Sequence, residues 1–240
     1  MNVVRFTIDR PPFAGRTGHD VRVAVIDSGV TAGHPHVGAV AQSVRVDAGI
    51  HADDVLDRLG HGTAVAAVIR EKAPASELMS VKVFDRALST SAEALARGIT
   101  WAADEGVRLI NLSLGTRIQE REELLLAAIA HAASRGAIVV SAAESDGVRW
   151  LPGSLPGVAG VLLDWKLERY EIAVRLDESA HPSFRASGYP RPIPGVPRER
   201  NLSGASFSVA NVTGFLARLL ETDNEARTIA DVGRLLASVP

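Results

Sequence analysis

The sequence contains no cysteine among its 240 residues. This absence excludes a disulfide framework, a thiol nucleophile and a cysteine-ligated metal site. No apolar run reaches the roughly 18 uncharged residues that a membrane helix needs. Residues 1–12 carry neither the apolar segment of a secretion signal nor the amphipathic pattern of a mitochondrial one. We therefore expect a cytoplasmic protein that does not bind membranes.

Neither sign of charge is in large excess. The 26 lysines and arginines nearly balance the 28 aspartates and glutamates, which leaves a formal net charge of -2. A chain without a strong overall positive charge is not expected to attract nucleic acid or anionic lipid. Its length and its 46% hydrophobic residues predict a single domain over residues 1–240. The sequence carries no signal for an oligomeric state.

Short runs of β-branched residues alternate with longer alanine-rich segments. This pattern predicts an α/β fold, a three-layer, doubly wound and mostly parallel sheet with helices on both faces. The predicted strands are residues 21–26, 78–84, 107–112, 137–142 and 158–163, and the predicted helices are residues 63–70, 91–105, 120–134, 209–220 and 226–237.

The pattern changes after the fifth predicted strand. Near residues 166–177 apolar and polar side chains alternate, which predicts a small antiparallel β excursion. Residues 181–203 contain five prolines, too many for the interior of a helix or strand. We expect this segment to be an ordered loop that crosses the fold.

Three polar residues lie next to the ends of predicted strands or helices. Asp27 ends the run V-A-V-I-D, His61 stands between glycines before an alanine-rich helix, and Ser206 precedes a helix of small residues. Taken alone, each has an ordinary structural explanation: a turn residue, a loop histidine and a helix N-cap. Each is also a residue type used in nucleophilic catalysis, and functional groups gather at strand ends in such sheets.

Taken together, the order Asp, His, Ser in an α/β chain resembles the subtilisin arrangement of a catalytic triad. The segments D-S-G, G-H-G-T-A-V-A and G-A-S-F-S are similar to the three signatures of the subtilisin-like serine proteases, and the resemblance covers about residues 21–215. It implies a serine endopeptidase in which Ser206 attacks the peptide carbonyl, His61 moves the proton and Asp27 holds the imidazole.

The resemblance also implies a substrate-binding edge. Ser113, Leu114 and Gly115 match the segment of the family that pairs with an extended peptide or protein substrate. No cofactor is implied. No acidic loop of the calcium-binding kind stands near His61, so we expect no metal. Only 26 residues precede Asp27, too few for the folding propeptide of secreted relatives.

Two residues depart from the family inside the implied site. The family usually carries A-A-G-N where this chain has Ala142, Ala143, Glu144 and Ser145. Ser145 then replaces the asparagine of the oxyanion hole, and its shorter side chain predicts slower turnover. Glu144 replaces a glycine beside the primary specificity pocket. It either selects a basic substrate residue, narrows the pocket, or is an exposed loop carboxylate.

Two functions are consistent with these observations. The first is an intracellular endopeptidase of narrow peptide specificity, for example one that removes the leader of a precursor peptide. The second is a noncatalytic or weakly active protein of the same fold that binds peptides near Ser113. The presence of Asp27, His61 and Ser206 favours the first, and Ser145 in place of asparagine keeps the second open.

Overall fold

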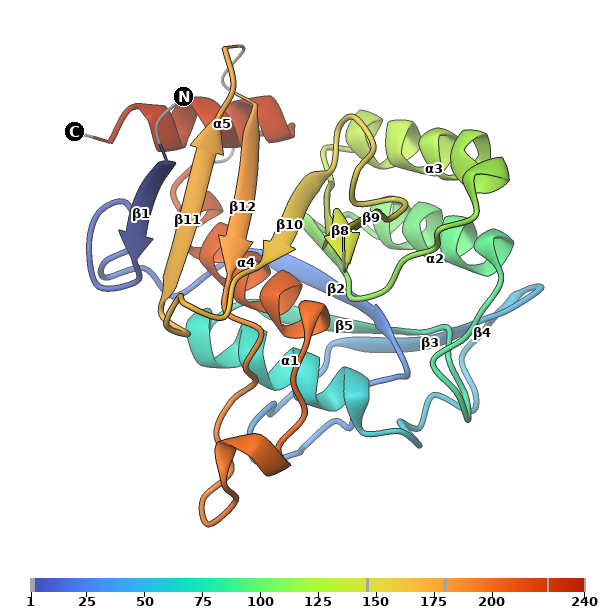
Figure 1. Cartoon of the computed structure of the whole chain (residues 1–240). Coiled ribbons are helices and arrows are strands. Elements are labelled where there is room, and N and C mark those ends of the chain that lie inside the picture. Colours follow the sequence, from blue (N-terminus) through green and yellow to red (C-terminus); the bar gives the residue numbers. More distant parts are fainter. Residues whose placement is uncertain (1–2, 146, 179–180, 224, 240) are drawn as a thin grey trace.

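A twisted sheet of ten strands runs through the part of the chain that the computed structural model describes, residues 3–145, 147–178, 181–223 and 225–239 (Figure 1). Most neighbouring strands run parallel, and the antiparallel strands lie toward the two edges. In spatial order the strands are β1 (Val3–Thr7), β11 (Glu171–Leu176), β12 (Pro182–Ala186), β10 (Ala159–Leu163), β7 (Ile138–Ala142), β6 (Leu109–Leu112), β2 (Arg22–Asp27), β5 (Glu77–Lys82), β3 (Gln42–Val46) and β4 (Ile50–His51).

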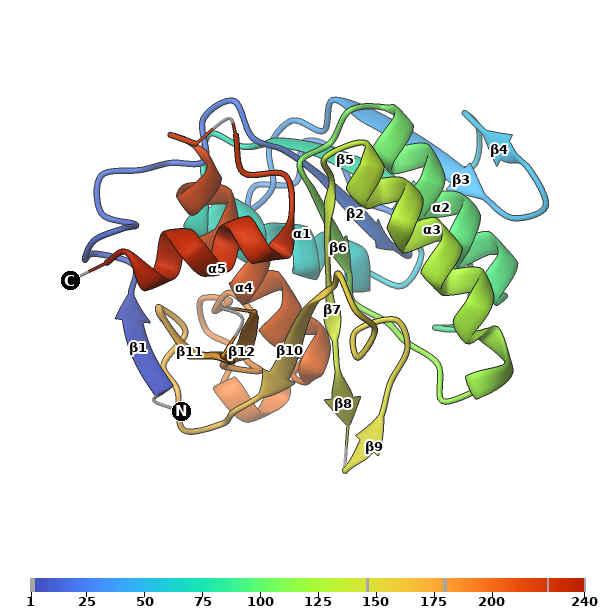
Figure 2. The ribbon, with the colours of Figure 1, turned by 90° about the horizontal axis from the view of Figure 1, so that it is seen from above.

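Helices cover both faces of this sheet. On one face lie α1 (His61–Lys72), α4 (Ala205–Leu220) and α5 (Ile229–Ala237), which share one apolar core with the sheet. On the other face lie α2 (Ala92–Asp104) and α3 (Glu122–Ser134), which share a second core. Figure 2 shows α2 and α3 side by side on their face. The three-layer α/β fold that the sequence predicts is therefore confirmed.

The predicted helices and parallel strands are all present, with different ends. Ser91 caps α2, because its side chain accepts the backbone N–H of Ala94 at 3.0 Å. A short 3-10 turn, η1 (Gln119–Arg121), precedes α3. The most useful difference concerns α4, which begins at Ala205 rather than 209 and so includes Ser206 in its first turn.

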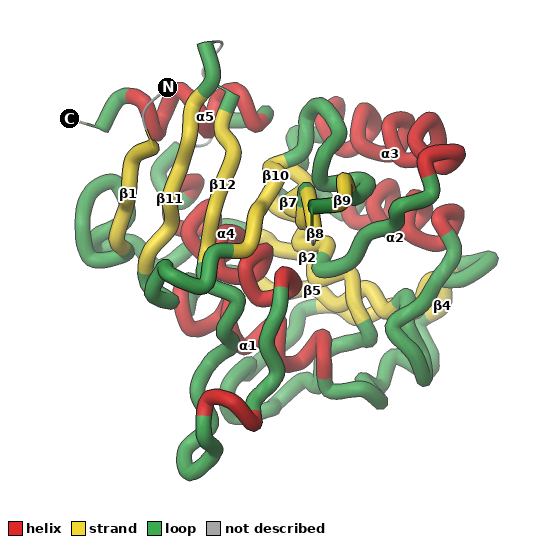
Figure 3. Tube along the Cα trace, in the orientation of Figure 1, coloured by secondary structure: helices red, strands yellow, loops and turns green. Residues whose placement is uncertain are grey.

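The region after β10 differs more from the expectation. The antiparallel segment expected near residues 166–177 is a strand only from Glu171, and it belongs to the main sheet, between β1 and β12. The prediction of a loop over residues 181–203 is wrong at its start, where β12 forms. Pro182 is the first residue of β12, a position that tolerates a missing N–H. The loop with η2 (Arg198–Arg200) begins only after it (Figure 3).

Two further features surround the place where the chemistry is expected. A separate two-stranded hairpin, β8 (Glu144–Ser145) and β9 (Val148–Arg149), follows β7. The loop between β12 and α4 lies against the first half of α1 and lines with it a cavity of about 440 Å³. The carboxyl end of β2 lies beside the start of α1, and the carboxyl end of β6 lies beside the start of α4.

Candidate active site

Asp27 and His61 lie in direct contact at the centre of the candidate site. Asp27 ends β2 and is fully buried, and His61 is the first residue of α1. Nδ1 of His61 lies 2.7 Å from Oδ1 of Asp27. Because a carboxylate only accepts, Nδ1 carries the hydrogen and Nε2 is left as the basic atom. The backbone N–H of Ser28 donates to the same Oδ1 at 2.7 Å and helps to fix the carboxylate.

The approach of α1 to β2 depends on Gly62. A Cβ atom at this position would lie 2.1 Å from the carbonyl oxygen of Gly29 and 3.0 Å from Cβ of Asp27. Contacts this short are not tolerated, so only glycine lets the helix begin against the end of the strand. The second glycine of the G-H-G motif is thus required for the contact between His61 and Asp27.

Opposing effects act on the pKa of His61. Burial lowers this pKa, whereas the hydrogen bond with Asp27 and the charges of Asp27 and Asp57 raise it. The raising effects are larger, and the pKa of His61 lies above the ordinary histidine value of about 6.5. The carboxylates therefore stabilise the imidazolium that forms when His61 accepts a proton.

Ser206 lies beside this pair in the first turn of α4. The ring of the next residue, Phe207, lies 5.9 Å from the imidazole of His61, measured between centroids. The Ser206 hydroxyl donates to the carbonyl oxygen of Ser113 at 3.0 Å. Within the described residues it makes no hydrogen bond to His61. The structure thus brings the three predicted residues together, with the serine hydroxyl turned toward Ser113.

A chain of buried side chains fixes the position of Ser113 against α4. The hydroxyl of Thr213 donates to Oδ1 of Asn111 at 2.9 Å, and Nδ2 of Asn111 donates to the Ser113 hydroxyl at 2.7 Å. The Ser113 hydroxyl in turn lies 3.4 Å from the carbonyl oxygen of Ser206. Because Asn111 and Thr213 are completely buried, these bonds hold the end of β6 to the helix that carries Ser206.

The edge formed by Ser113, Leu114 and Gly115 continues β6 beyond the sheet. A Cβ on Gly115 would lie 2.7 Å from Cε3 of Trp150 and 2.8 Å from the carbonyl oxygen of Leu151, so this position requires glycine. The backbone groups of Gly115 have no hydrogen-bond partner within the described residues. Leu114 and Gly115 line a cavity of about 380 Å³ with the apolar side chains of Phe84, Leu88, Leu95 and Ile118.

Glu144 lies in β8, where its side chain is exposed. It lines a cavity of about 400 Å³ together with Arg185 of β12, Trp165, and the two residues that precede Ser206, Gly204 and Ala205. Neither Glu144 nor Arg185 has an ion-pair partner among the residues that the structure describes. The sequence singles out Glu144 but not Arg185, because nothing in the sequence shows that these two residues line the same cavity.

Ser145 is the predicted replacement for the oxyanion asparagine. Its backbone pairs with Val148 in the β8–β9 hairpin. Its side chain lies outside the described part of the structure, so its predicted role stays a prediction.

Sequence reasoning missed Ser28, whose backbone N–H donates to Asp27, and Asp57, which accepts the Ser28 hydroxyl. Asp57 lies four residues before His61, in the loop that leads into α1. Its carboxylate accepts the backbone N–H of Thr63 at 2.9 Å and the hydroxyl of Ser28 at 2.8 Å. An aspartate shortly before a helix is a capping signal that the sequence does contain.

The described residues contain no group of three histidine, aspartate or glutamate side chains that could hold a metal ion. No helix in the same part of the chain is long and apolar enough to cross a membrane.

Comparison with known proteins places the chain in a family. Residues 18–160 match the model of the subtilase family. The chain belongs to the subtilase family. As a subtilase it is a serine endopeptidase, as the resemblance of its three motifs predicts.

The relatives of this subtilase agree with that assignment. It is 31% identical to Subtilisin Savinase of Lederbergia lenta over 216 residues, which cover 83% of this chain and 72% of the relative. It is also 31% identical to an alkaline protease of Shouchella clausii, of which it spans only about half (51%), again with 83% of this chain covered. The crystal structure of a lanthipeptide protease shares the fold, with a TM-score of 0.69, 20% identity, and coverage of 91% of this chain and 80% of that one.

Proposed function

We propose that this subtilase cleaves peptide bonds inside the cell by an Asp27–His61–Ser206 triad and acts on a narrow range of peptides, such as a precursor from which a leader is removed. The observation that carries the catalytic assignment is the 2.7 Å hydrogen bond between His61 and the buried Asp27, with Ser206 at the start of the adjacent helix. This arrangement leaves Nε2 of His61 as a base for the serine hydroxyl.

In the first step the Ser206 hydroxyl leaves the carbonyl of Ser113 and gives its proton to Nε2 of His61, while Oγ bonds to the carbonyl carbon of the substrate. The imidazolium then gives that proton to the leaving amine as the peptide bond breaks. Water repeats the same steps on the acyl enzyme and releases the acid. Asp27 keeps its hydrogen bond to Nδ1 of His61 and stabilises the imidazolium.

Substrate binding at the edge supports the first step. An extended peptide that pairs with Ser113 and Gly115 presents its own N–H groups to these backbone carbonyls. A peptide N–H that donates to the carbonyl of Ser113 competes with the Ser206 hydroxyl for the same oxygen. Binding therefore favours the rotamer of Ser206 that faces His61.

The start of α4 supplies an environment for the oxyanion. The backbone N–H of Ser206 belongs to the first turn of α4 and has no hydrogen-bond partner within the described residues. Unpaired N–H groups at the positive end of a helix favour a negative oxygen there. We propose that Ser145 supplies a second donor.

Charged groups beside Ser206 support narrow specificity. Glu144 and Arg185 line the cavity that borders Gly204 and Ala205. A cavity with fixed charges of both signs discriminates against apolar side chains and selects charged or polar ones. The lanthipeptide protease shares only the fold with this chain, so the specificity proposed for this chain rests on these two side chains.

The decisive experiment is labelling by a fluorophosphonate probe, which reacts with activated serines. We expect labelling of the wild-type protein at pH 8, its loss in Ser206→Ala, and full labelling of Ser203→Ala, which removes an exposed serine from the loop just before α4. Folded wild-type protein that stays unlabelled would instead favour the noncatalytic peptide-binding function.

The part of Ser145 is tested separately by kinetics. If its side chain donates to the oxyanion, Ser145→Ala lowers kcat by about tenfold or more with little change in KM, and Ser145→Asn restores or raises kcat. Equal kcat values in all three proteins would show that the oxyanion hole is built from other donors.

A further inference from the structure

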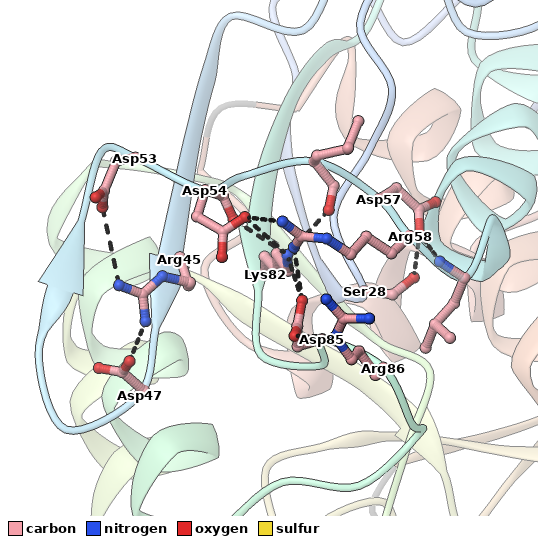
Figure 4. Close-up of polar contacts among 12 residues, drawn as sticks. Ser28, Arg45, Asp47, Asp53, Asp54, Asp57, Arg58, Lys82, Asp85 and Arg86 are labelled. Atoms are coloured by element: carbon pink, nitrogen blue, oxygen red, sulfur yellow. Dashed lines mark hydrogen bonds and ion pairs between the residues drawn. The ribbon is translucent and has the colours of Figure 1, made fainter.

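Asp57 differs from the other acidic residues of its loop in its surroundings. Asp53 and Asp54 are exposed, and Asp54 forms ion pairs with Arg58 and Lys82. Asp57 is half-buried and points instead toward Ser28 and the start of α1 (Figure 4). It forms no ion pair within the described residues, so its negative charge is compensated only by hydrogen bonds.

Five donors surround this carboxylate. Oδ1 accepts the Ser28 hydroxyl at 2.8 Å, the N–H of Gly60 at 2.8 Å and the N–H of Leu59 at 3.1 Å. Oδ2 accepts the N–H of Thr63 at 2.9 Å and its hydroxyl at 2.6 Å. Burial raises the pKa of Asp57, but these hydrogen bonds outweigh burial and hold the pKa below its ordinary value. Asp57 is therefore ionised at neutral pH.

These hydrogen bonds reach both partners of the Asp27–His61 pair. On one side Ser28 links Asp57 to β2, since the backbone N–H of Ser28 donates to Asp27 at 2.7 Å. The Ser28 hydroxyl also accepts the N–H of Gly62 at 3.0 Å. On the other side Asp57 binds Gly60 and Thr63, the residues around His61 in the chain. A single carboxylate thus joins the end of β2 to the first turn of α1.

We propose that Asp57 is a positioning residue: through Ser28 and the first turn of α1 it holds His61 against Asp27, and its negative charge stabilises the imidazolium. This inference rests on the proposed function, because it assigns Asp57 to the same triad. Asp57 does not touch the reacting atoms. It acts on them through the geometry and charge that it imposes on His61.

Few charges face the imidazole, so the contribution of Asp57 is measurable. Asp27 faces it from β2 and Asp57 from the loop before α1, while α4 contributes the neutral ring of Phe207. Both carboxylates act in the direction that favours the protonated imidazole. A residue that served only as a helix cap would stabilise α1 without any effect on the protonation of His61.

The first test replaces the charge and keeps the shape. Histidine labelled with ¹³C at Cε1 is titrated by NMR in the wild type, Asp57→Asn and Asp54→Asn, and the His61 signal is assigned by its loss in His61→Gln. We expect the pKa of His61 to fall by about 0.3 to 1 in Asp57→Asn and to stay unchanged in Asp54→Asn, the matched control in the same loop. Equal pKa values in the two variants would overturn the electrostatic part of the proposal.

The second test separates position from charge. Ser28→Ala breaks one link but leaves the Asp57 carboxylate in place. We expect it to lower kcat by about tenfold with KM within about twofold, while the pKa of His61 changes less than in Asp57→Asn. Wild-type kcat in both Ser28→Ala and Asp57→Asn would overturn the positioning role. If Asp57→Asn does not fold, Ser28→Ala and Asp57→Glu, which both keep the negative charge, still test the positioning role, and wild-type kcat in both would overturn it.

The NMR titration can be carried out whether or not the protein is an active enzyme. If the wild-type protein fails to react with the fluorophosphonate, the proposed function fails, whereas the effect of Asp57 on His61 is still decided by the titration. If labelling succeeds and the titration and kcat show no effect of Asp57, only the positioning role fails.

Discussion

The Ser206 hydroxyl donates to the carbonyl oxygen of Ser113 at 3.0 Å, and the same carbonyl belongs to the edge on which the substrate is proposed to lie. Within the described residues the Ser206 hydroxyl therefore bonds to Ser113 and makes no hydrogen bond to His61. The proposed nucleophile and the proposed substrate-binding edge thus share one oxygen atom, and a variant that displaces the edge is expected to affect both.

Gly115→Ala tests this coupling. The added methyl group meets Trp150 and the carbonyl of Leu151 at less than 3 Å, so the edge must shift. We expect KM to rise about tenfold and the free energy of unfolding to fall by about 1–3 kcal/mol. The control is Gly98→Ala in α2, whose new methyl finds its nearest contact at 3.4 Å from Val81. Peptide kinetics that match the wild type in Gly115→Ala would place the substrate elsewhere.

The pH dependence of activity follows from His61. The pKa of this residue lies above about 6.5, the ordinary value, and the proposed mechanism needs the neutral imidazole. We expect kcat/KM to fall on the acid side as a single proton binds, with the midpoint above pH 6.5. A midpoint below pH 6 would show that Asp27 and Asp57 do not act on His61 as the structure indicates.

The same shift affects stability with a defined sign. Because folding raises the pKa of His61, its protonated form stabilises the fold at low pH, and this contribution disappears as the pH rises through the folded pKa. The wild type should therefore exceed His61→Gln in free energy of unfolding by more at pH 5.5 than at pH 8.5.

Lys72 gives an opposite pH dependence. Its side chain is completely buried at the end of α1, beside Glu71 and over the ring of Tyr170. Burial lowers the pKa of Lys72 to about 7, so between about pH 7 and pH 10 the unfolded chain holds a proton that the folded chain does not. Stability due to this group therefore rises with pH over that range.

Urea denaturation of Lys72→Met measures this effect. We expect the variant to lose the pH-dependent gain, so that the difference in free energy of unfolding between wild type and variant changes by about 2–4 kcal/mol from pH 7 to pH 10. The exposed Lys166→Met serves as the control and should follow the wild type. Parallel curves for wild type and Lys72→Met would show that Lys72 stays protonated inside the protein.

Metal dependence provides a simpler measurement. With no candidate metal group among the described residues, we expect EDTA to leave the melting temperature and peptide hydrolysis unchanged. A fall of several degrees on adding EDTA, reversed by calcium, would show that the protein binds a stabilising metal ion.

The sequence predicts the layers of the fold because each layer has its own periodicity. Runs such as residues 21–26 are almost entirely apolar, which indicates central strands. The glycines around His61 indicate a close approach of helix and strand, although α1 begins at His61 rather than at the predicted residue 63. The prolines of residues 181–203 hide β12, since a proline is harmless at the first position of a strand. Only tertiary pairing with β10 and β11 reveals that strand.

The site is predictable to the extent that it follows from the chain order of known motifs. Asp27, His61 and Ser206 are identified in this way, and the Asp27–His61 contact agrees with it. Arg185 and Asp57 are not, because their significance depends on what lies beside them in space. Arg185 lines the cavity of Glu144 because of the position of β12, and the role proposed for Asp57 depends on the hydroxyl of Ser28, in another loop, which donates to it.

Glu144 and Arg185 are expected to set the charge preference beside the scissile bond. If Glu144 binds a basic side chain of the substrate, Glu144→Gln reduces the preference for arginine over a neutral isostere by about tenfold or more in kcat/KM. Arg185→Gln should then increase that preference, because it removes the positive charge that shares the cavity. Peptide pairs that differ only at the residues flanking the cleaved bond measure both effects and show which side of the bond the cavity accepts. Unchanged preferences in both variants would mean that the two side chains are ordinary surface charges, and the narrow specificity proposed from them would have to come from the edge at Ser113.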